Sequence, residues 1–122
     1  MRPVFVFGSN EAGIHGRGSA LYAKEHYGAK NGVGVGRSGN AYAIPTKDRD
    51  LRTLPLPEIF KHVTVFLEYA RKYHHIHFRV TAIGCGLAGY CHEQIAPMFY
   101  GAPDNCLLPE LWRDMAYQPY VP

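Results

Sequence analysis

The sequence predicts an α/β domain in which helices cover the faces of a central β-sheet. Short apolar runs typical of buried strands alternate along the chain with amphipathic segments typical of helices. Glycine clusters separate several of these segments, at places where the backbone must turn sharply or approach a ligand closely. The length of 122 residues fits one domain, so we expect residues 1–122 to form a single unit.

Two strands and one helix are expected in the first part of the chain. Residues 3–7 form an apolar run of β-branched and aromatic side chains, which predicts a buried strand. Residues 19–27 carry alanine and tyrosine side chains at helical spacings of three and four, and Gly28 ends this helix. A second strand is expected over residues 40–44, where Pro45 closes it.

The longest expected element is a helix that begins at Pro57. Apolar side chains keep a helical period along it, namely Ile59, Phe60, Val63, Phe66, Leu67, Ala70 and Tyr73. Residues 76–83 then alternate apolar and polar side chains, which predicts a strand. We expect a further helix near residues 92–99, a short strand over residues 105–108 and one or two helical turns over residues 109–115.

Composition and charge narrow the classes of function. The formal net charge of +3 is too small and too scattered for a general nucleic-acid-binding protein, but it suits an anionic ligand. No apolar run is long enough to span a membrane. The apolar segment at the start of the chain is too short for the core of a signal peptide. The 3 cysteines lack the spacing of a disulfide framework. We therefore expect a cytoplasmic protein with no membrane partner.

Two glycine-rich loops each follow an expected strand and precede an expected helix. The first spans residues 8–20 and the second spans residues 82–90. Free backbone N–H groups and the positive end of a helix dipole can bind a phosphate at such a place. The first loop lacks both the Gly-Lys-Ser/Thr of a P-loop and the acidic residue of a dinucleotide-binding site. Each loop alone also fits a plain tight turn, whereas the pair predicts a site that holds both sides of one diphosphate.

Three motifs in these segments carry a family resemblance. Residues 10–20 read NEAGIHGRGSA, residues 83–89 read IGCGLAG, and residues 44–47 read IPTK before a charged stretch and the long helix. The first two resemble the ligand loops of macro domains, the second of which binds a diphosphate. The third is similar to one branch, which contains antitoxin macro domains that remove ADP-ribose from DNA and relatives that cleave it from glutamate. The motifs occur in the family's order over roughly residues 4–99.

The resemblance implies a three-layer αβα macro-like fold with a mixed central sheet. Macro domains usually carry a Gly-Asp-Ile/Leu segment, on or after an earlier strand, whose aspartate reads the adenine amino group. The present chain begins too late to contain that segment. We therefore expect a sheet that can lack the usual first strand, and the contact to adenine stays open.

The same resemblance implies catalytic roles for Lys47 and Asn10. Asn10 falls where the DNA-acting branch has an asparagine beside the distal ribose, and Lys47 falls where both branches have their catalytic lysine. A lysine can act as a nucleophile or acid at an anomeric carbon when desolvation or nearby cations, such as Arg49 and Arg52, favour its neutral form. The alternative is a plain loop lysine that pairs with Asp48 or with a phosphate.

Both glycine loops supply expected ligand-binding residues. Residues 84–87 match the loop whose backbone amides hold the diphosphate, while Ala88 stands where the glutamate-specific branch has an aspartate. The expected ligand-binding residues are Gly8, Ser9, Gly13, His15, Gly16, Gly18, Gly84, Cys85, Gly86, Leu87, Ala88, Gly89 and Tyr90.

Several side chains near these loops also have plain structural interpretations. His15 is either an acid–base group or an exposed loop histidine, and Cys85 is either a nucleophile or a small buried side chain. Tyr90 either stacks on the ligand or packs in the core. Arg37 either reaches a phosphate or has no role in binding. The histidines within residues 74–77 lack the spacing of a zinc site, so we expect no metal and no cofactor.

Two hypotheses about function follow. The first is a hydrolase that removes ADP-ribose from a nucleobase or an acidic side chain of a macromolecule, which Asn10 and Lys47 favour. The second is a non-catalytic module that binds ADP-ribose or a related signalling nucleotide, which Ala88 and the absent adenine-reading segment favour. A Cys85-dependent enzyme is a third alternative. The residues do not predict an oligomeric state.

Overall fold

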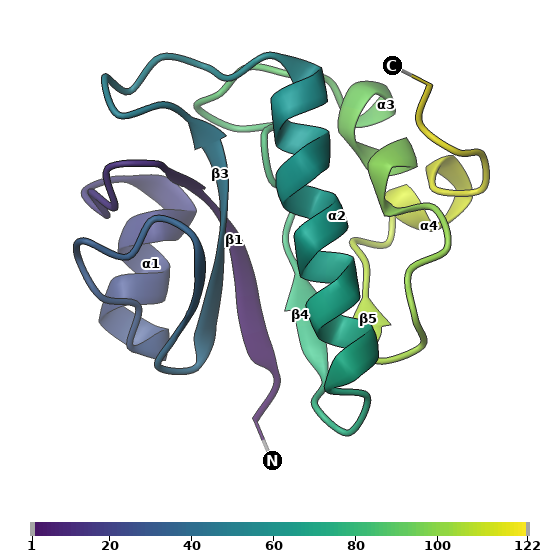
Figure 1. Cartoon of the computed structure of the whole chain (residues 1–122), viewed down its shortest axis with the longest axis horizontal. Coiled ribbons are helices and arrows are strands. Elements are labelled where there is room, and N and C mark those ends of the chain that lie inside the picture. Colours follow the sequence, from purple (N-terminus) through teal and green to yellow (C-terminus); the bar gives the residue numbers. More distant parts are fainter. Residues whose placement is uncertain (1, 122) are drawn as a thin grey trace.

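Five strands form one mixed sheet in the computed structural model, which describes residues 2–121 (Figure 1). The strands are β1 (Val4–Asn10), β2 (Gly36–Ser38), β3 (Ala41–Lys47), β4 (Phe78–Val80) and β5 (Cys106–Leu107). Their order across the sheet is β2-β3-β1-β4-β5. Strands β3, β1, β4 and β5 run parallel to one another, and the edge strand β2 is antiparallel to β3. The α/β class and the mixed sheet are therefore confirmed.

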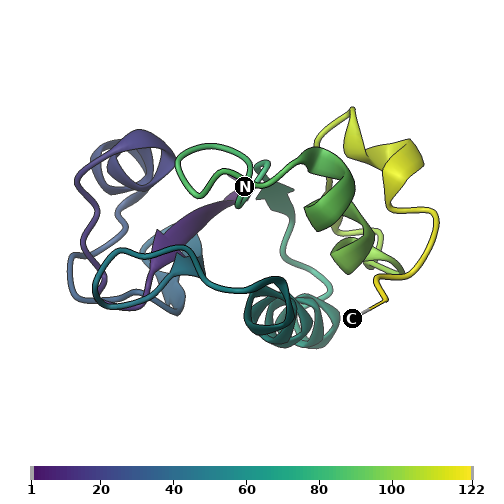
Figure 2. The same ribbon diagram turned by 90° about the horizontal axis from the view of Figure 1, so that it is seen from above.

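Helices cover both faces of this sheet and complete three layers (Figure 2). They are α1 (Gly18–Tyr27), α2 (Leu56–Lys72), α3 (His92–Ile95), the 3-10 helix η1 (Ala96–Phe99) and α4 (Trp112–Met115). Helix α1 packs on one face, whereas α2, α3, η1 and α4 pack on the other. No helix within residues 2–121 is long and apolar enough to cross a membrane.

Alternating side chains of β1 divide the core between the two faces. Val4 and Val6 belong to the cluster beneath α2, while Phe5 and Phe7 belong to the cluster beneath α1. The first cluster is the larger and holds the bulky side chains Tyr42, Ile44, Phe66, Phe78, Phe99 and Trp112. The second contains mainly alanines, namely Ala20, Ala23, Ala29, Ala41 and Ala43. These small side chains let α1 lie close to the sheet.

Helix α2 forms as its apolar period predicts. Pro57 lies in the first turn, where the missing N–H of proline leaves no hydrogen bond unmade. The side chains that face the sheet are fully or almost fully buried, namely Ile59, Val63, Phe66, Leu67 and Ala70. Phe60 lies at the margin of this face and is half-buried.

Strands β3 and β4 end at other residues than the sequence predicts. Strand β3 continues through Pro45, because β2 pairs with it only as far as Ala43 and leaves the outer edge of β3 free where the proline lies. Strand β4 is shorter than expected. At Thr81 both the backbone N–H and the hydroxyl donate to the carbonyl of Val6, and the chain then turns into the second glycine loop.

Candidate functional site

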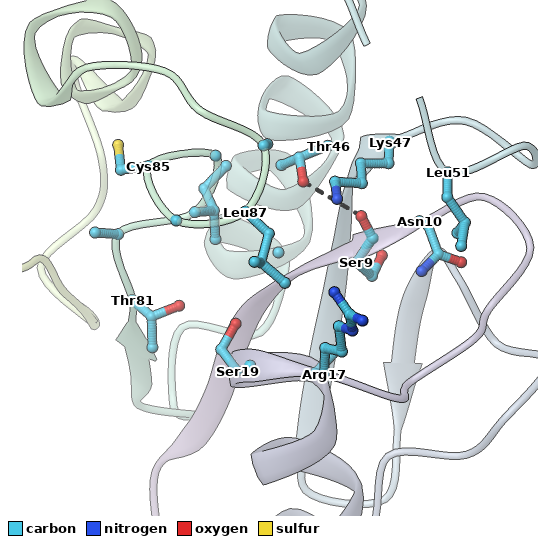
Figure 3. Close-up of a pocket in the computed structure, with 18 of the residues that line it drawn as sticks. Ser9, Asn10, Arg17, Ser19, Thr46, Lys47, Leu51, Thr81, Cys85 and Leu87 are labelled. Carbon is cyan, nitrogen blue, oxygen red and sulfur yellow. Dashed lines mark hydrogen bonds between the residues drawn. The ribbon is translucent and has the colours of Figure 1, made fainter. Parts of the chain in front are cut away.

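A cavity of about 710 Å³ lies at the carboxyl ends of β1, β3 and β4 (Figure 3). The first turn of α1 and the second glycine loop also line it. This is the edge of a parallel sheet at which α/β proteins bind ligands, and the volume suits a nucleotide-sized molecule. The expected site residues that line the cavity are Gly8, Ser9, Asn10, Gly16, Gly18, Lys47, Gly84, Cys85, Gly86, Leu87 and Ala88.

A register irregularity places Asn10 beside Lys47. Strands β1 and β3 pair in step as far as Ser9 and Pro45, after which Asn10 pairs with Lys47 and Thr46 is passed over. Such irregularities redirect side chains and are common next to active sites. The two residues with expected catalytic roles are therefore neighbours at the lining of the cavity.

The Asn10 carboxamide holds the first glycine loop in shape. Its Nδ2 donates to the carbonyl of Ile14 at 2.8 Å, and its Oδ1 accepts from the N–H of Ile14 at 2.9 Å. A carboxamide has two N–H donors, so one of them remains for a ligand. Asn10 is thus a loop-shaping residue that keeps one donor at the cavity.

Lys47 is half-buried and forms no ion pair within residues 2–121. Asp48 does not pair with it, and Oδ1 of Asp48 instead accepts from the backbone N–H groups of Asp50 and Arg52 at 2.8 and 3.0 Å. A second cation, Arg17, lines the same cavity and extends its guanidinium into it (Figure 3). Among the described residues, no Asp or Glu lines the cavity. Its fully charged side chains are therefore all positive.

Unpaired backbone N–H groups add to this positive character. Helix α1 begins at the cavity with no side-chain cap and no acidic residue in its first turn. In the second loop, internal hydrogen bonds use the N–H groups of Cys85, Gly89 and Tyr90. Within residues 2–121 no hydrogen bond uses those of residues 86–88. Helix N-termini and successive free amides of this kind bind anions.

Three exposed aliphatic side chains line the cavity from three different loops. They are Ile14, Leu51 and Leu87, which are 54%, 46% and 63% exposed. Leu51 has a φ of 63°, a left-handed conformation that is uncommon for leucine. Leu87 reaches toward Gly18, where an added Cβ would lie 3.7 Å from its Cδ1. The two glycine loops thus approach each other at the cavity.

The thiol of Cys85 is a poor nucleophile in this environment. Burial, and then the neighbouring Cys91 and Glu93, raise the pKa of Cys85 from 9.0 to about 11. The thiolate is the reactive form, so almost all of this side chain is protonated and unreactive near neutral pH. The half-buried thiol fits the interpretation of Cys85 as a small packed side chain.

Two expected residues of the first loop lie away from the cavity lining. His15 is 1% exposed, because the chain around Val33 folds over it. Its Nε2 bonds to the carbonyl of Val33 at 3.1 Å, and its ring packs edge-on against Phe7. Gly13 has a φ of 73°, and a Cβ there would lie 2.5 Å from the carbonyl carbon of Gly32. Both residues hold the loop against its neighbouring segment.

Gly89, Tyr90 and Arg37 also lie outside the lining. The Tyr90 hydroxyl donates to the carbonyl of Leu54 at 2.6 Å, so this tyrosine ties the second loop to the segment before α2. Gly89 closes a turn, donating its N–H to the carbonyl of Gly86 at 3.0 Å. Arg37 lies on β2 and donates from Nε to the carbonyl of Gly39 at 2.9 Å.

Polar residues that sequence reasoning missed also line the cavity, namely Arg17, Ser19, Thr46, Thr81 and His92. Thr46 lies near the end of β3, Thr81 directly follows β4, and the other three lie at the start of α1 or α3. Their position at the ends of strands and the starts of helices was the available signal. Within residues 2–121 no group of three or more His, Cys, Asp or Glu residues is placed to hold a metal ion.

The cavity thus combines two cations, unpaired N–H groups and a nucleotide-sized volume. These are the properties of a site for a phosphorylated ligand. No protein-family model matches this chain, and neither a curated protein nor a solved structure is similar enough to match it.

Proposed function

We propose that this protein is a macro-like domain that binds ADP-ribose in the cavity and removes it hydrolytically from a macromolecule. The observation that carries the proposal is the wholly positive charge of a nucleotide-sized cavity between two glycine loops. A diphosphate suits the free amides of residues 86–88 on one side and the start of α1 on the other. The motif resemblance to macro domains favours ADP-ribose among the possible diphosphates.

The chemistry is assigned to Lys47 and Asn10. Lys47 acts at the anomeric carbon of the distal ribose. There the bond to the target breaks, the oxygen of water bonds to the carbon, and the proton released by water passes to the leaving target group. It has no carboxylate partner, so its ammonium group is free to meet the ligand. Asn10 lies next to it across the sheet, and its remaining N–H orients the distal ribose.

A non-catalytic binding module is the second candidate. Ala88 places a methyl group where a carboxylate acts in the glutamate-specific branch, and the Asn10 carboxamide is already engaged by Ile14. Under this alternative the same cavity captures ADP-ribose, or a signalling nucleotide related to it, and releases it unchanged.

The proposal extends to partners and location. The target of the hydrolase is an ADP-ribosylated nucleic acid or an ADP-ribosylated protein, and the domain works without a membrane and without a cofactor. All three cysteines are free thiols, which suits the reducing conditions of the cytoplasm.

Isothermal titration tests the binding step. ADP-ribose is titrated beside AMP and ribose 5-phosphate, each of which fills only part of the cavity. We expect ADP-ribose to bind more tightly than both fragments, because only ADP-ribose carries the diphosphate between the two loops. Absence of ADP-ribose binding would remove it as the ligand and with it the proposed function.

Turnover separates the two candidates. ADP-ribosylated DNA and protein ADP-ribosylated on glutamate are incubated with the protein, and free ADP-ribose is measured by mass spectrometry. The hydrolase releases ADP-ribose, and Lys47→Ala abolishes release while binding persists. Lys61→Ala is the matched control, because Lys61 is an exposed lysine of α2 that pairs with Glu58. Unchanged substrate with the wild-type protein would support the binding module instead.

A further inference from the structure

His92 joins the C-terminal part of the chain to the cavity. It is the first residue of α3, follows the second glycine loop and lines the cavity. Its Nδ1 lies 2.9 Å from the Nε1 of Trp112, which is the first residue of α4 and is 0% exposed. The two rings pack edge to face with centroids 6.3 Å apart.

This hydrogen bond determines which nitrogen of His92 carries the proton. The indole Nε1–H of tryptophan is a donor only, so Nδ1 of His92 must be the acceptor. A neutral imidazole that accepts at Nδ1 carries its proton on Nε2. A proton on Nδ1 would place two donors 2.9 Å apart and leave the Trp112 N–H without its acceptor. Of the two neutral tautomers of His92, Trp112 therefore selects the one with an Nε2–H.

The surroundings of His92 differ from the cationic part of the cavity. Figure 3 shows Thr81 and Cys85 on one side and Lys47 and Asn10 on the other. His92 lies nearer the first side, because its neighbour Glu93 is close enough to Cys85 to affect that thiol. The carboxylate of Glu93, the next residue, helps to raise the pKa of the Cys85 thiol and so disfavours negative charge there. Beyond the free amides of residues 86–88, the cavity beside Thr81 and Cys85 therefore suits an uncharged part of a ligand.

We propose that His92 binds the ligand by donating its Nε2–H to an uncharged acceptor, with Trp112 as the positioning residue that fixes the tautomer. The acceptor is a hydroxyl oxygen of a ribose or a ring nitrogen of the base. The identity of this ligand rests on the proposed function. The neutral tautomer does not, because the Trp112 hydrogen bond holds it in the free protein.

The tautomer can be measured without any ligand. Long-range proton–nitrogen correlation spectra distinguish the two ring nitrogens of each histidine, and His92→Gln assigns the His92 signals by their loss. We expect a bare Nδ1 and a protonated Nε2 at pH 7. Trp112→Phe keeps the aromatic ring but removes the N–H, so this variant gives a mixture of tautomers. A protonated Nδ1 in the wild-type protein would overturn the proposal.

Titration of matched variants tests the contact with the ligand. His92→Leu removes the donor and should weaken ADP-ribose binding by about five- to tenfold, whereas His92→Gln keeps an N–H and should retain most of the affinity. His74→Leu is the control, because His74 is exposed and lies outside the cavity lining. Thermal melts establish that each variant is folded.

The fragments identify the part of the ligand that His92 contacts. A loss with both ADP-ribose and AMP points to the AMP moiety, whereas a loss with both ADP-ribose and ribose 5-phosphate points to the distal ribose. Equal affinity of His92→Leu and the wild-type protein for ADP-ribose overturns the proposed contact alone. If the wild-type protein binds no ADP-ribose, the proposed function fails, and the tautomer measurement still decides whether His92 is held as a neutral donor.

Discussion

Arg17 and Lys47 bring positive charge to the cavity from different elements. Lys47 ends β3 and is half-buried, whereas Arg17 precedes α1 and is exposed at the rim. A guanidinium can bind a phosphate through two parallel hydrogen bonds, which a lysine ammonium cannot do. Under the proposed function, Arg17 therefore binds the diphosphate and Lys47 acts at the distal ribose.

Replacement of Arg17 tests this division of roles. Arg17→Ala should weaken ADP-ribose binding by about tenfold, since one charge-assisted hydrogen bond contributes about 1.5 kcal/mol or more. The salt dependence of binding should also become shallower. Arg113→Ala, which removes an exposed arginine of α4, should leave the affinity unchanged in the same titrations. Equal losses in both variants would mean that only overall charge matters.

The cysteines should differ sharply in reactivity. Iodoacetamide at pH 7 should modify the exposed Cys91 first, because burial raises the pKa of Cys85 to about 11 and that of Cys106 to about 12. The modification rate of Cys85 should rise as the pH approaches 11, where its thiolate becomes populated. Peptide mass spectrometry over time measures each rate. Rapid modification of Cys85 at pH 7, with loss of ADP-ribose release, would revive the cysteine-dependent enzyme.

Among the elements, those with a strong local pattern could be predicted from sequence. The helical period between Ile59 and Ala70 predicts α2 because the same side chains that repeat also face the core. Strand β2 (Gly36–Ser38) has no such pattern, because only Ser38 of its residues is buried. Pairing with β3 stabilises this strand instead. The expected end of β3 at Pro45 was wrong because an unpaired strand edge tolerates proline.

Of the candidate site, too, only the part with a local sequence pattern could be predicted. Glycine placement and motif resemblance led to both loops, to Asn10 and to Lys47, all of which meet at the cavity. The position of His15 depends on a segment that is distant in sequence, because the carbonyl of Val33 and the side chain of Asn31 hold it inside. His92 could not be singled out for a similar reason. Its partner Trp112 is 20 residues away and was predicted only as part of a terminal helical turn.

Gly34, which packs against the first glycine loop, and Gly86 of the second loop should respond differently to alanine. A Cβ at Gly34 would lie 2.2 Å from the carbonyl oxygen of Asn10, so Gly34→Ala must displace backbone and should cost about 2–3 kcal/mol of stability. A Cβ at Gly86 meets no atom within 4 Å, so Gly86→Ala should change stability by less than about 0.5 kcal/mol. Chemical denaturation measures both free energies of unfolding.

The same pair separates stability from binding. Gly86 lines the cavity, and its N–H is one of the free amides of the second loop. The added methyl group should therefore weaken ADP-ribose binding although the fold is intact. Unchanged affinity of Gly86→Ala would show that the ligand does not approach this loop closely.

At the scale of the whole molecule, the cavity lies between two helical layers that bury different amounts of apolar side chain. The layer with α2 has a large core of aromatic and branched side chains, whereas the layer with α1 rests on Phe5, Phe7 and alanines. Burial of larger apolar side chains stabilises a layer more, and local opening occurs preferentially where few are buried. The start of α1, which lines the cavity, therefore belongs to the less stable layer, and the second loop reaches it across the cavity.

This arrangement predicts how the ligand changes local stability. Without ligand, amide hydrogens of α1 should exchange faster than those of α2, because the α1 layer opens more readily. ADP-ribose should slow exchange at residues 16–20 and 84–88, since the proposed binding mode contacts both loops and opening would break those contacts. Exchange within residues 59–70 of α2 should stay unchanged, because that helix contributes nothing to the cavity lining. Hydrogen-exchange mass spectrometry with ADP-ribose, AMP and ribose 5-phosphate measures each segment. Protection of only one loop by ADP-ribose would mean that the ligand does not bridge them, and the two-loop site for the diphosphate would then be wrong.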